Sequence, residues 1–264
     1  MSRIAALLPT QPLSLDRDNV FGASCVAAWV GGVQGFSAGN NYAAVPNSGV
    51  SFVDSPYGIA QRSGAGPDGV KIASGGLDSL GLPVAGSFTA TMLVKIVSLG
   101  TRRIFMGDYS SAATNHSIEM EQTAGDKWQI QAVNVAPTAL PSPVGSITVT
   151  TGWHWCDLVC DRVNSVITAF VDGVSNSTSA WTSNRRAGTD LRVGRPGAYT
   201  LLPFDGDIAC AYFFSTPYQQ NQLAQLRRDP AQIFKTPWQR SRVGAVVAAS
   251  GNPWSYYAQM RRAA

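Results

Sequence analysis

The chain has 264 residues, of which 14% are charged and 45% are hydrophobic, and its formal net charge at pH 7 is +4. This composition excludes a disordered chain, and the length suffices for one large domain whose core needs no disulfides. No stretch reaches the roughly 20 apolar residues of a membrane-spanning helix, so we expect no membrane contact. The small positive charge comes without a nucleic-acid-binding motif, so we expect protein partners rather than nucleic acid.

The predicted elements begin with an apolar stretch, residues 1–9, which ends at a proline. The stretch is too short for a signal peptide, and we therefore expect synthesis and folding in a cytoplasm. Residues 1–20 are predicted to form an amino-terminal arm, and residues 21–237 the body of the protein. Val26–Val30 is the first predicted strand.

The body carries short runs of strand length, bounded by glycine, proline, asparagine and aspartate, which are typical of an antiparallel sandwich. Residues 116–122 and 127–132 alternate apolar and polar side chains around a turn and predict a hairpin with one buried face. One amphipathic helix is predicted from Tyr218 to Arg228, with Leu223 and Leu226 toward the sheet. The other predicted strands are 87–96, 103–107, 146–150, 153–161, 166–173, 191–194 and 204–215.

Four cysteines lie within the predicted body, at Cys25, Cys156, Cys160 and Cys210. Cys156 and Cys160 are four residues apart on one predicted strand, which places them on one face about 13 Å apart, too far for a disulfide. Together with Leu158 they are predicted to be small, core-facing hydrophobic residues. We therefore expect neither a disulfide framework nor a cysteine metal site.

The last part of the chain, residues 238–264, differs from the body. It contains no acidic residue and interleaves arginines with aromatic residues. Because this composition is typical of interface anchors, we predict a carboxy-terminal arm that binds another protein. The predicted anchors are Trp238, Arg240, Arg242, Trp254, Tyr256, Tyr257, Arg261 and Arg262.

Several motifs in the second half of the body occur in a characteristic order. They are Trp153-His154 before a strand ending in Asp161, Phe170-Val-Asp-Gly173, Val193-Gly194, Phe204-Asp-Gly206-Asp-Ile208, and Asp229-Pro230. This order resembles the concanavalin A-like, laminin-G-like jelly rolls found in bacteriophage virion structural proteins. The resemblance implies an all-β, antiparallel two-sheet jelly-roll sandwich with one short C-terminal helix and extended terminal arms. It also makes Val26–Val30 an edge strand.

Glu119 and Glu121 are the candidates for glycoside hydrolysis. Two residues apart on a strand, they share one face with Cα atoms about 6.5–7 Å apart, which suits a retaining glycosidase. Hydrolases with the resembled fold carry a Glu-x-Asp-x-Glu pattern, whereas here the run is Glu119-Met-Glu-Gln-Thr-Ala124. Because Ile118 and Met120 are expected to face the core, we assign both glutamates to a solvated hairpin face and predict no catalytic residues.

The two histidines, His116 and His154, could each supply the base of a Ser-His-Asp hydrolase. The resemblance gives His154 a structural position, and His116 follows a predicted loop, so we assign neither to catalysis. Asp172, Asp205 and Asp207 match family positions that serve turns and the sheet. We therefore expect no calcium or other metal and no cofactor.

Carbohydrate binding is the main alternative, because lectins and binding modules of the resembled fold stack sugars on exposed aromatic rings. The candidates for such stacking are Tyr109, Trp181 and Tyr199, each in a loop-like stretch. Aromatic residues in loops also occur at protein interfaces, so the sequence leaves both readings open.

The resemblance and the two arms together predict a non-enzymatic phage virion structural protein, most simply a capsid decoration or cement protein on the particle surface. Its expected partners are the major capsid protein or other virion proteins, with further copies of itself. The alternative is a tail-associated adhesin or carbohydrate-binding module that recognises host surface glycans. A free-standing glycosidase is the third hypothesis.

Overall fold

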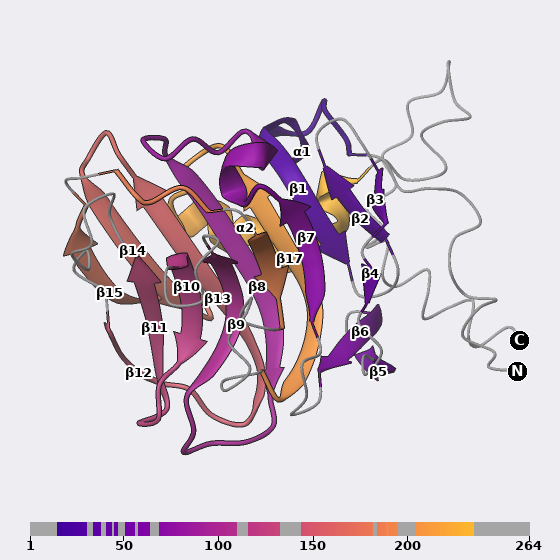
Figure 1. Cartoon of the computed structure of the whole chain (residues 1–264), viewed down its shortest axis with the longest axis vertical. Helices are drawn as coiled ribbons and strands as arrows, with labels where there is room; N and C mark the ends of the chain where they lie inside the picture. Colours follow the sequence, from indigo (N-terminus) through magenta and orange to yellow (C-terminus); the bar gives the residue numbers. More distant parts are fainter. Residues whose placement is uncertain are drawn as a thin grey trace, which may run out of the picture.

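The computed structural model describes residues 15–30, 34–37, 41–43, 45–46, 51–55, 58–63, 69–109, 116–132, 144–181, 184–188, 190–194 and 204–234. Two antiparallel sheets face each other and form a sandwich (Figure 1). The predicted all-β, two-sheet fold with a short C-terminal helix is confirmed. Of the two predicted arms, residues 1–14 and 238–264 lie outside the described residues.

The larger sheet has ten strands, in the order β15-β14-β13-β8-β17-β1-β2-β3, and β6 joins β17 to β5. Val26–Val30, predicted as an edge strand, belongs to an interior strand, because β2 and β3 continue the sheet beyond it. The strands are β1 (Cys25–Val30), β2 (Gln34–Ser37), β3 (Asn41–Ala43), β5 (Ser51–Ser55), β6 (Gly58–Ser63), β8 (Phe88–Ile96), β13 (Gly152–Asp161), β14 (Val166–Val171), β15 (Val174–Ala180) and β17 (Gly206–Phe214).

The smaller sheet has seven strands, in the order β12-β11-β10-β9-β16-β7-β4. They are β4 (Val45–Pro46), β7 (Val70–Ser74), β9 (Arg103–Tyr109), β10 (His116–Gln122), β11 (Lys127–Ala132), β12 (Val144–Thr148) and β16 (Asp190–Val193). The predicted hairpin is present as β10 and β11. The helical elements are α1 (Val20–Ser24), η2 (Leu77–Leu80), α2 (Gln220–Arg228) and η3 (Pro230–Ile233).

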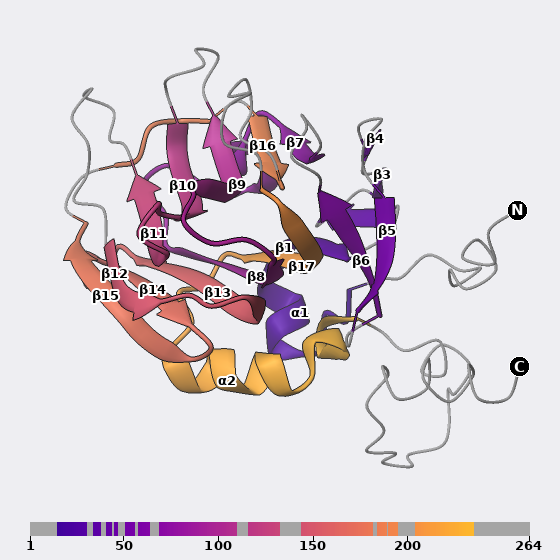
Figure 2. The same cartoon turned by 90° about the horizontal axis from the view of Figure 1, so that it is seen from below.

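The ten-stranded sheet is buried on both faces where β8, β13 and β17 cross it. On β13, Cys156, Leu158 and Cys160 point into the core between the sheets, as predicted, while Trp155 and Val159 point to the other side. There α2 covers the sheet with Leu223 and Leu226 (Figure 2), and η3 and α1 add to the same apolar layer. All four cysteines are buried and free, so they contribute as small hydrophobic residues.

One ion pair fastens α2 to the sheet. Asp157 is fully buried on the helix side of β13 and accepts hydrogen bonds from Arg227 and from the Thr91 hydroxyl. Burial raises the pKa of Asp157, and the Arg227 guanidinium opposes this shift. Removal of one partner of a buried pair leaves an uncompensated charge and costs about 3–5 kcal/mol.

We expect Arg227→Ala to lower the free energy of unfolding by about 3 kcal/mol, because Asp157 then stays buried without its cation. Arg228→Ala, at the exposed neighbouring position, should change it by less than about 0.5 kcal/mol. Urea denaturation of both variants measures the difference. Equal effects of the two substitutions would show that the pair with Asp157 contributes nothing.

A second buried ion cluster joins four chain segments, where β9 ends and β10 begins. The Arg185 guanidinium, with no exposed surface, donates to Asp108 at 3.3 Å, to Asp78 at 3.0 Å and to the Ser117 hydroxyl at 2.9 Å. Burial raises the pKa of Asp108 to about 6, against the opposing charge of Arg185. The folded protein therefore binds a proton at Asp108 more tightly than the unfolded chain does.

The sign of this shift sets a pH dependence of stability. The contribution of Asp108 is full below pH about 4 and is lost as the pH rises to about 6, by roughly 3 kcal/mol. Because asparagine does not titrate, the free-energy difference between wild type and Asp108→Asn should change over this interval and stay constant above pH 7. Denaturant titrations at several pH values measure it, and a constant difference from pH 4 to 7 would contradict the shift.

Candidate functional site

The face of the seven-stranded sheet that points away from the core carries a group of polar side chains. On β10, Ile118 and Met120 pack in the core between the sheets. Glu119 and Glu121 alternate with them and point to the other side, yet they are only 2% and 0% exposed. The prediction that these glutamates form a solvated hairpin face is therefore wrong, because neighbouring side chains enclose both carboxylates.

Arg102 bridges the two carboxylates. Its Nε donates to Glu121 Oε2 at 2.5 Å, and its Nη2 donates to Glu119 Oε2 at 3.2 Å. The Tyr109 hydroxyl donates to the other oxygen of Glu119 at 2.8 Å, and Gln131 Nε2 donates to the other oxygen of Glu121 at 2.7 Å. We call these five residues, which come from the 97–102 loop and from strands β9, β10 and β11, the carboxylate cluster.

The absence of a side chain at Gly107 allows Tyr109 to reach the cluster. Gly107 lies beside Glu119 in the β9–β10 register, and Tyr109 is two residues further along β9. A Cβ atom at Gly107 would come within 2.1 Å of Tyr109 Cε2. The ring therefore lies across the glycine, and its hydroxyl meets Glu119 on the neighbouring strand.

Burial governs the protonation of the cluster. Desolvation raises the pKa of Glu119, against the Tyr109 hydrogen bond and the charge of Arg102. It also raises the pKa of Glu121, which Arg102 opposes by charge and by hydrogen bond. Groups whose pKa values are shifted by desolvation and by a specific charge partner are enriched at functional sites, which makes this cluster a candidate.

Polar side chains continue from the cluster across β9 to the next strand. Arg192 on β16 lies opposite Gly107, and its Nε donates to Asp190 at 2.7 Å. Lys71 on β7 also pairs with Asp190, at 3.3 Å. Polar side chains that pair with one another thus extend over this face of the sheet from β11 to β7.

The loop that carries Arg102 is fixed by Asp126, in the turn between β10 and β11. Asp126 Oδ1 accepts hydrogen bonds from the Gly100 amide at 2.7 Å and from Gln122 Nε2 at 2.6 Å. The Asp126 backbone has φ 58°, and its carbonyl accepts from Val149 in a third loop. Three loops at this end of the sandwich are therefore held together, and Arg102 follows two residues after the anchored Gly100.

The aromatic residues predicted to stack on sugars do not form such a site. Tyr109 belongs to β9 rather than to a loop and is 2% exposed, with its hydroxyl bound to Glu119. Trp181 is 1% exposed, because Phe88 packs edge-on against its ring and the Arg162 guanidinium covers it. Both predictions are wrong, since these rings are buried, and Tyr199 lies outside the described residues.

The eight predicted interface anchors, Trp238, Arg240, Arg242, Trp254, Tyr256, Tyr257, Arg261 and Arg262, also lie outside the described residues.

His154 has a structural contact: Nδ1 bonds Asp172 at 2.8 Å, and Nε2 bonds the Thr150 carbonyl at 2.9 Å. His116 opens β10 opposite Tyr109. Asp205 accepts a hydrogen bond from the Ser98 hydroxyl, and Asp207 accepts one from Arg62, so both carboxylates have partners within the fold.

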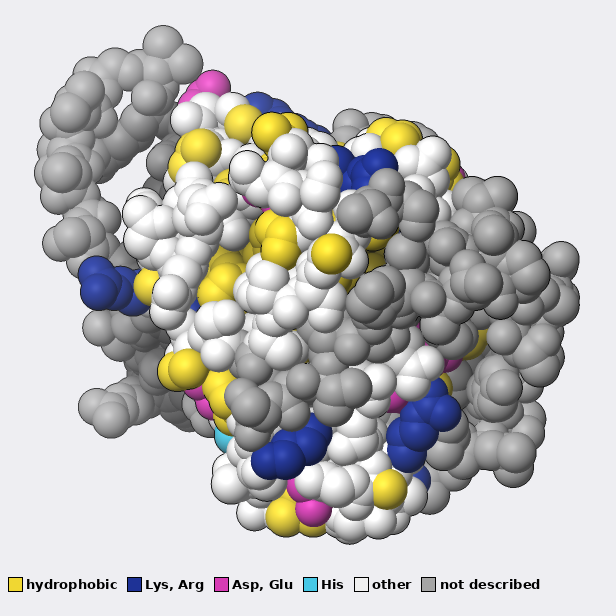
Figure 3. Space-filling model, turned by 90° about the vertical axis from the view of Figure 1, so that its left-hand side faces the viewer, with side chains coloured by type: hydrophobic (Ala, Val, Ile, Leu, Met, Phe, Trp, Pro, Cys, Tyr) yellow, Lys and Arg dark blue, Asp and Glu magenta, His cyan; other side chains and the backbone are white. Residues whose placement is uncertain are grey.

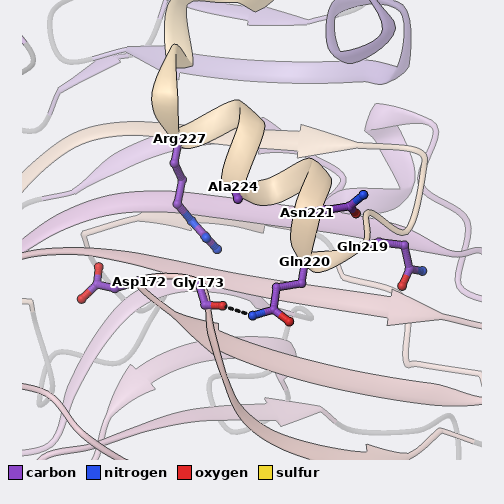
Figure 4. Close-up of a pocket in the computed structure, with 7 residues that line it drawn as sticks. All are labelled: Asp172, Gly173, Gln219, Gln220, Asn221, Ala224 and Arg227. Carbon is purple, nitrogen blue, oxygen red and sulfur yellow. Dashed lines mark hydrogen bonds between the residues drawn. The ribbon is translucent and has the colours of Figure 1, made fainter.

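An open hollow lies between α2 and the turn that joins β14 to β15 (Figure 4). Gln220 reaches across it to the Gly173 carbonyl, whereas the Asp172 carboxylate points away from Arg227. Asp172 is already bound by His154 and by the Trp155 amide. Arg227 is committed to Asp157, and Gln219, Gln220 and Asn221 supply further polar side chains to the lining of the hollow.

Within the described ranges, no group of three or more His, Cys, Asp or Glu side chains has the arrangement of a metal site. No helix in this part of the chain is long and apolar enough to cross a membrane.

No protein-family model matches the chain, and no curated protein matches its sequence. Solved structures do match. The binding domain of Paraclostridial Mosquitocidal Protein 1 is 10% identical, with a TM-score of 0.59 over 78% of this chain and 52% of that one. The botulinum neurotoxin serotype D ligand binding domain, in complex with N-acetylneuraminic acid, is 8% identical, with a TM-score of 0.61 over 79% and 51%.

Domain 4 of the extracellular GH43 arabinanase AbnA from Geobacillus stearothermophilus, in complex with arabinotriose, is 14% identical, with a TM-score of 0.52. The match covers 77% of this chain and 98% of that domain. The chain spans about half the length of the two toxin domains. At these identities the similarity shows a shared β-sandwich fold.

We expect Asp126→Ala to release the 97–102 loop, because the substitution removes two hydrogen bonds and places alanine at a positive φ, at a cost of about 2 kcal/mol. Hydrogen exchange of the Gly100 amide should become faster. Asp126→Asn is the matched control, since asparagine keeps the Oδ1 acceptor and tolerates this backbone conformation. Unchanged exchange in Asp126→Ala would mean that other contacts fix the loop.

Proposed function

We propose that this protein is a glycan-binding β-sandwich, and that the carboxylate cluster forms the polar part of its binding surface. One observation supports this most directly. Glu119, Glu121 and Arg102 form an ionic network on the sheet face that the hydrophobic core does not need. Buried charges are costly, and groups whose pKa values are shifted by burial and by a charge partner are enriched at binding and catalytic sites.

The chemistry of the cluster fits sugar hydroxyls. A guanidinium group donates hydrogen bonds to hydroxyl oxygens, and the two buried carboxylates hold the Arg102 guanidinium in a fixed orientation. Arg102 is 37% exposed at its side chain, so it is the cluster member that a ligand would meet first. The sugar complexes of two matched structures, with N-acetylneuraminic acid and with arabinotriose, add support by analogy of fold.

Binding without hydrolysis is part of the proposal. Both carboxylates are engaged by Arg102, and each has a further hydrogen bond, from Tyr109 or Gln131. A catalytic pair needs one carboxyl group free to protonate a glycosidic oxygen and one placed to attack the sugar. We therefore expect no release of reducing sugar from any glycan that the protein binds.

Glycan arrays probed with the full-length protein test this function. We expect wild type to retain at least one glycan class and Arg102→Lys to lose it at least roughly tenfold, because lysine cannot bridge two carboxylates as arginine does. Arg228→Lys, on the opposite side of the protein, is the matched control and should bind like wild type. If no glycan binds above background, or if Arg102→Lys binds equally well, the proposal fails.

The capsid decoration role stays a prediction, because its anchors lie in residues 238–264. Its partners would be the major capsid protein or other virion proteins, and its location the particle surface. Co-sedimentation of full-length Arg261→Glu/Arg262→Glu protein with stripped particles tests it. Loss of co-sedimentation with retained glycan binding would assign attachment to the arm and recognition to the sandwich.

A further inference from the structure

The hollow between α2 and the β14–β15 turn has the size of a small-molecule site. Its volume is about 580 Å³, and sites for small ligands span roughly 300–1,000 Å³. The residues around it all belong to the described part of the chain. Because α2 covers the outer face of the ten-stranded sheet (Figure 2), the hollow lies on the opposite side of the sandwich from the carboxylate cluster.

Hydrogen bonds hold both walls of the hollow. On the sheet side, the Asp172 amide donates to the Trp155 carbonyl at 2.8 Å, and the Trp155 amide donates to the Asp172 carboxylate at 2.8 Å. On the helix side, Gln219 caps the first turn of α2. Gln220 joins the two walls through Nε2, which donates to the Gly173 carbonyl at 2.5 Å. A ligand would therefore meet a preformed site, and preorganisation lowers the entropic cost of binding.

Three carboxamide side chains at the start of α2 each have one end engaged and the other end free. The oxygens of Gln219 and Asn221 accept from the Gln222 amide, which leaves their NH2 groups as donors. Gln220 is engaged through its nitrogen, which leaves its Oε1 as an acceptor. All three side chains are exposed, and their free ends have no hydrogen-bond partner among the described residues.

Arg227 adds a fixed donor about two turns further along α2. Its Nη2 pairs with Asp157, which sets the orientation of the guanidinium. Its Nη1 lies against Gly173, where an added Cβ atom would come within 2.5 Å of it. The glycine at this turn therefore gives the guanidinium room beside the hollow.

The surroundings of the hollow favour a neutral ligand. The two charged residues of its lining each have a partner, Arg227 in Asp157 and Asp172 in His154. The adjacent strand β15 contains no charged residue. Figure 3 looks onto the side of the molecule where β15 lies, and charged side chains occupy only small parts of its described surface. A charged ligand would therefore find no unpaired counter-ion in the lining.

We propose that this hollow is a second binding site, which takes a small neutral sugar unit. A hydroxyl group both donates and accepts hydrogen bonds, so a ring with several hydroxyls matches a lining of NH2 donors, a guanidinium donor and a carboxamide oxygen. An apolar ligand would desolvate these groups without pairing them, which is unfavourable. The site goes beyond the glycan binding proposed for the carboxylate cluster and does not depend on it.

Ala224 keeps the hollow open. It follows Gln220 by one turn on the same side of α2 and is half-buried in the wall of the hollow (Figure 4). Its methyl group occupies little of the space, so a larger side chain at this position should fill it. Leucine suits this purpose because it is a strong helix former.

NMR of the side-chain NH2 groups tests the site in the full-length protein. We expect the signals of Gln219 and Asn221 to shift on titration with at least one of glucose, galactose, mannose, arabinose and N-acetylglucosamine, with millimolar affinity because the contacts are few. Asn221→Asp loses the NH2 donors but keeps the Oδ1 acceptor for the Gln222 amide. It should bind the sugar roughly fivefold to tenfold more weakly, with an unchanged melting temperature.

A pair of leucine variants separates the hollow from the rest of the helix surface. Ala224→Leu should abolish the sugar-induced shifts, whereas Gln225→Leu, at the exposed neighbouring position, should bind like wild type. Arg102→Lys should also keep the shifts, since the carboxylate cluster lies on the other sheet. Loss of the shifts in Arg102→Lys would assign the sugar to the cluster and overturn this proposal without affecting the first one.

Three further results would overturn the proposal. The first is the absence of shifts with all five sugars, and the second is undiminished binding by Ala224→Leu. The third is an equal response to a blocked dipeptide at the same concentration, because a peptide group also donates and accepts hydrogen bonds. That response would show a surface that binds amides in general rather than sugars.

Discussion

Burial of the ten-stranded sheet on both faces is the constraint on which the rest of the structure depends. Strands β8, β13 and β17 send alternate side chains into two separate apolar layers, one between the sheets and one beneath α2. The second layer requires α2 to stay in place, and the buried Asp157–Arg227 pair holds it there. Where α2 covers the ten-stranded sheet, a polar sheet face therefore has to belong to the seven-stranded sheet.

The outer face of the seven-stranded sheet carries polar side chains in an unusual arrangement. Its outer face buries two glutamates instead of exposing them, and Arg102, Tyr109 and Gln131 compensate for the lost solvation. Such a network adds little net stability, since well-packed apolar residues of similar volume would stabilise the fold equally or more. Ligand recognition, as proposed above, would give such a network a role on a face outside the main core.

The sequence was sufficient to predict what depends on local pattern. Strand alternation placed Cys156, Leu158 and Cys160 in the core, and turn residues located the β10–β11 hairpin. Prediction from the sequence failed where side chains that are distant in the sequence come into contact. Nothing in the alternation of β10 indicates that Arg102 and Tyr109 will enclose Glu119, and the missing side chain at Gly107 was the one local signal. The exposure of Trp181 was mispredicted for the same reason, because Phe88 of β8 and Arg162 of the β13–β14 turn cover its ring.

The anchoring of the 97–102 loop by Asp126 has a thermodynamic consequence for recognition. Because Gly100 and Gln122 are tied to one carboxylate, the loop is ordered before any ligand arrives. A binding surface of this kind loses little conformational entropy on association, so weak polar contacts can yield useful affinity. The exposed Val97 and Leu99 belong to the same loop, which fixes their distance from Arg102 and gives the surface a rigid apolar border. Discrimination between ligands would then arise from shape as well as from hydrogen bonding.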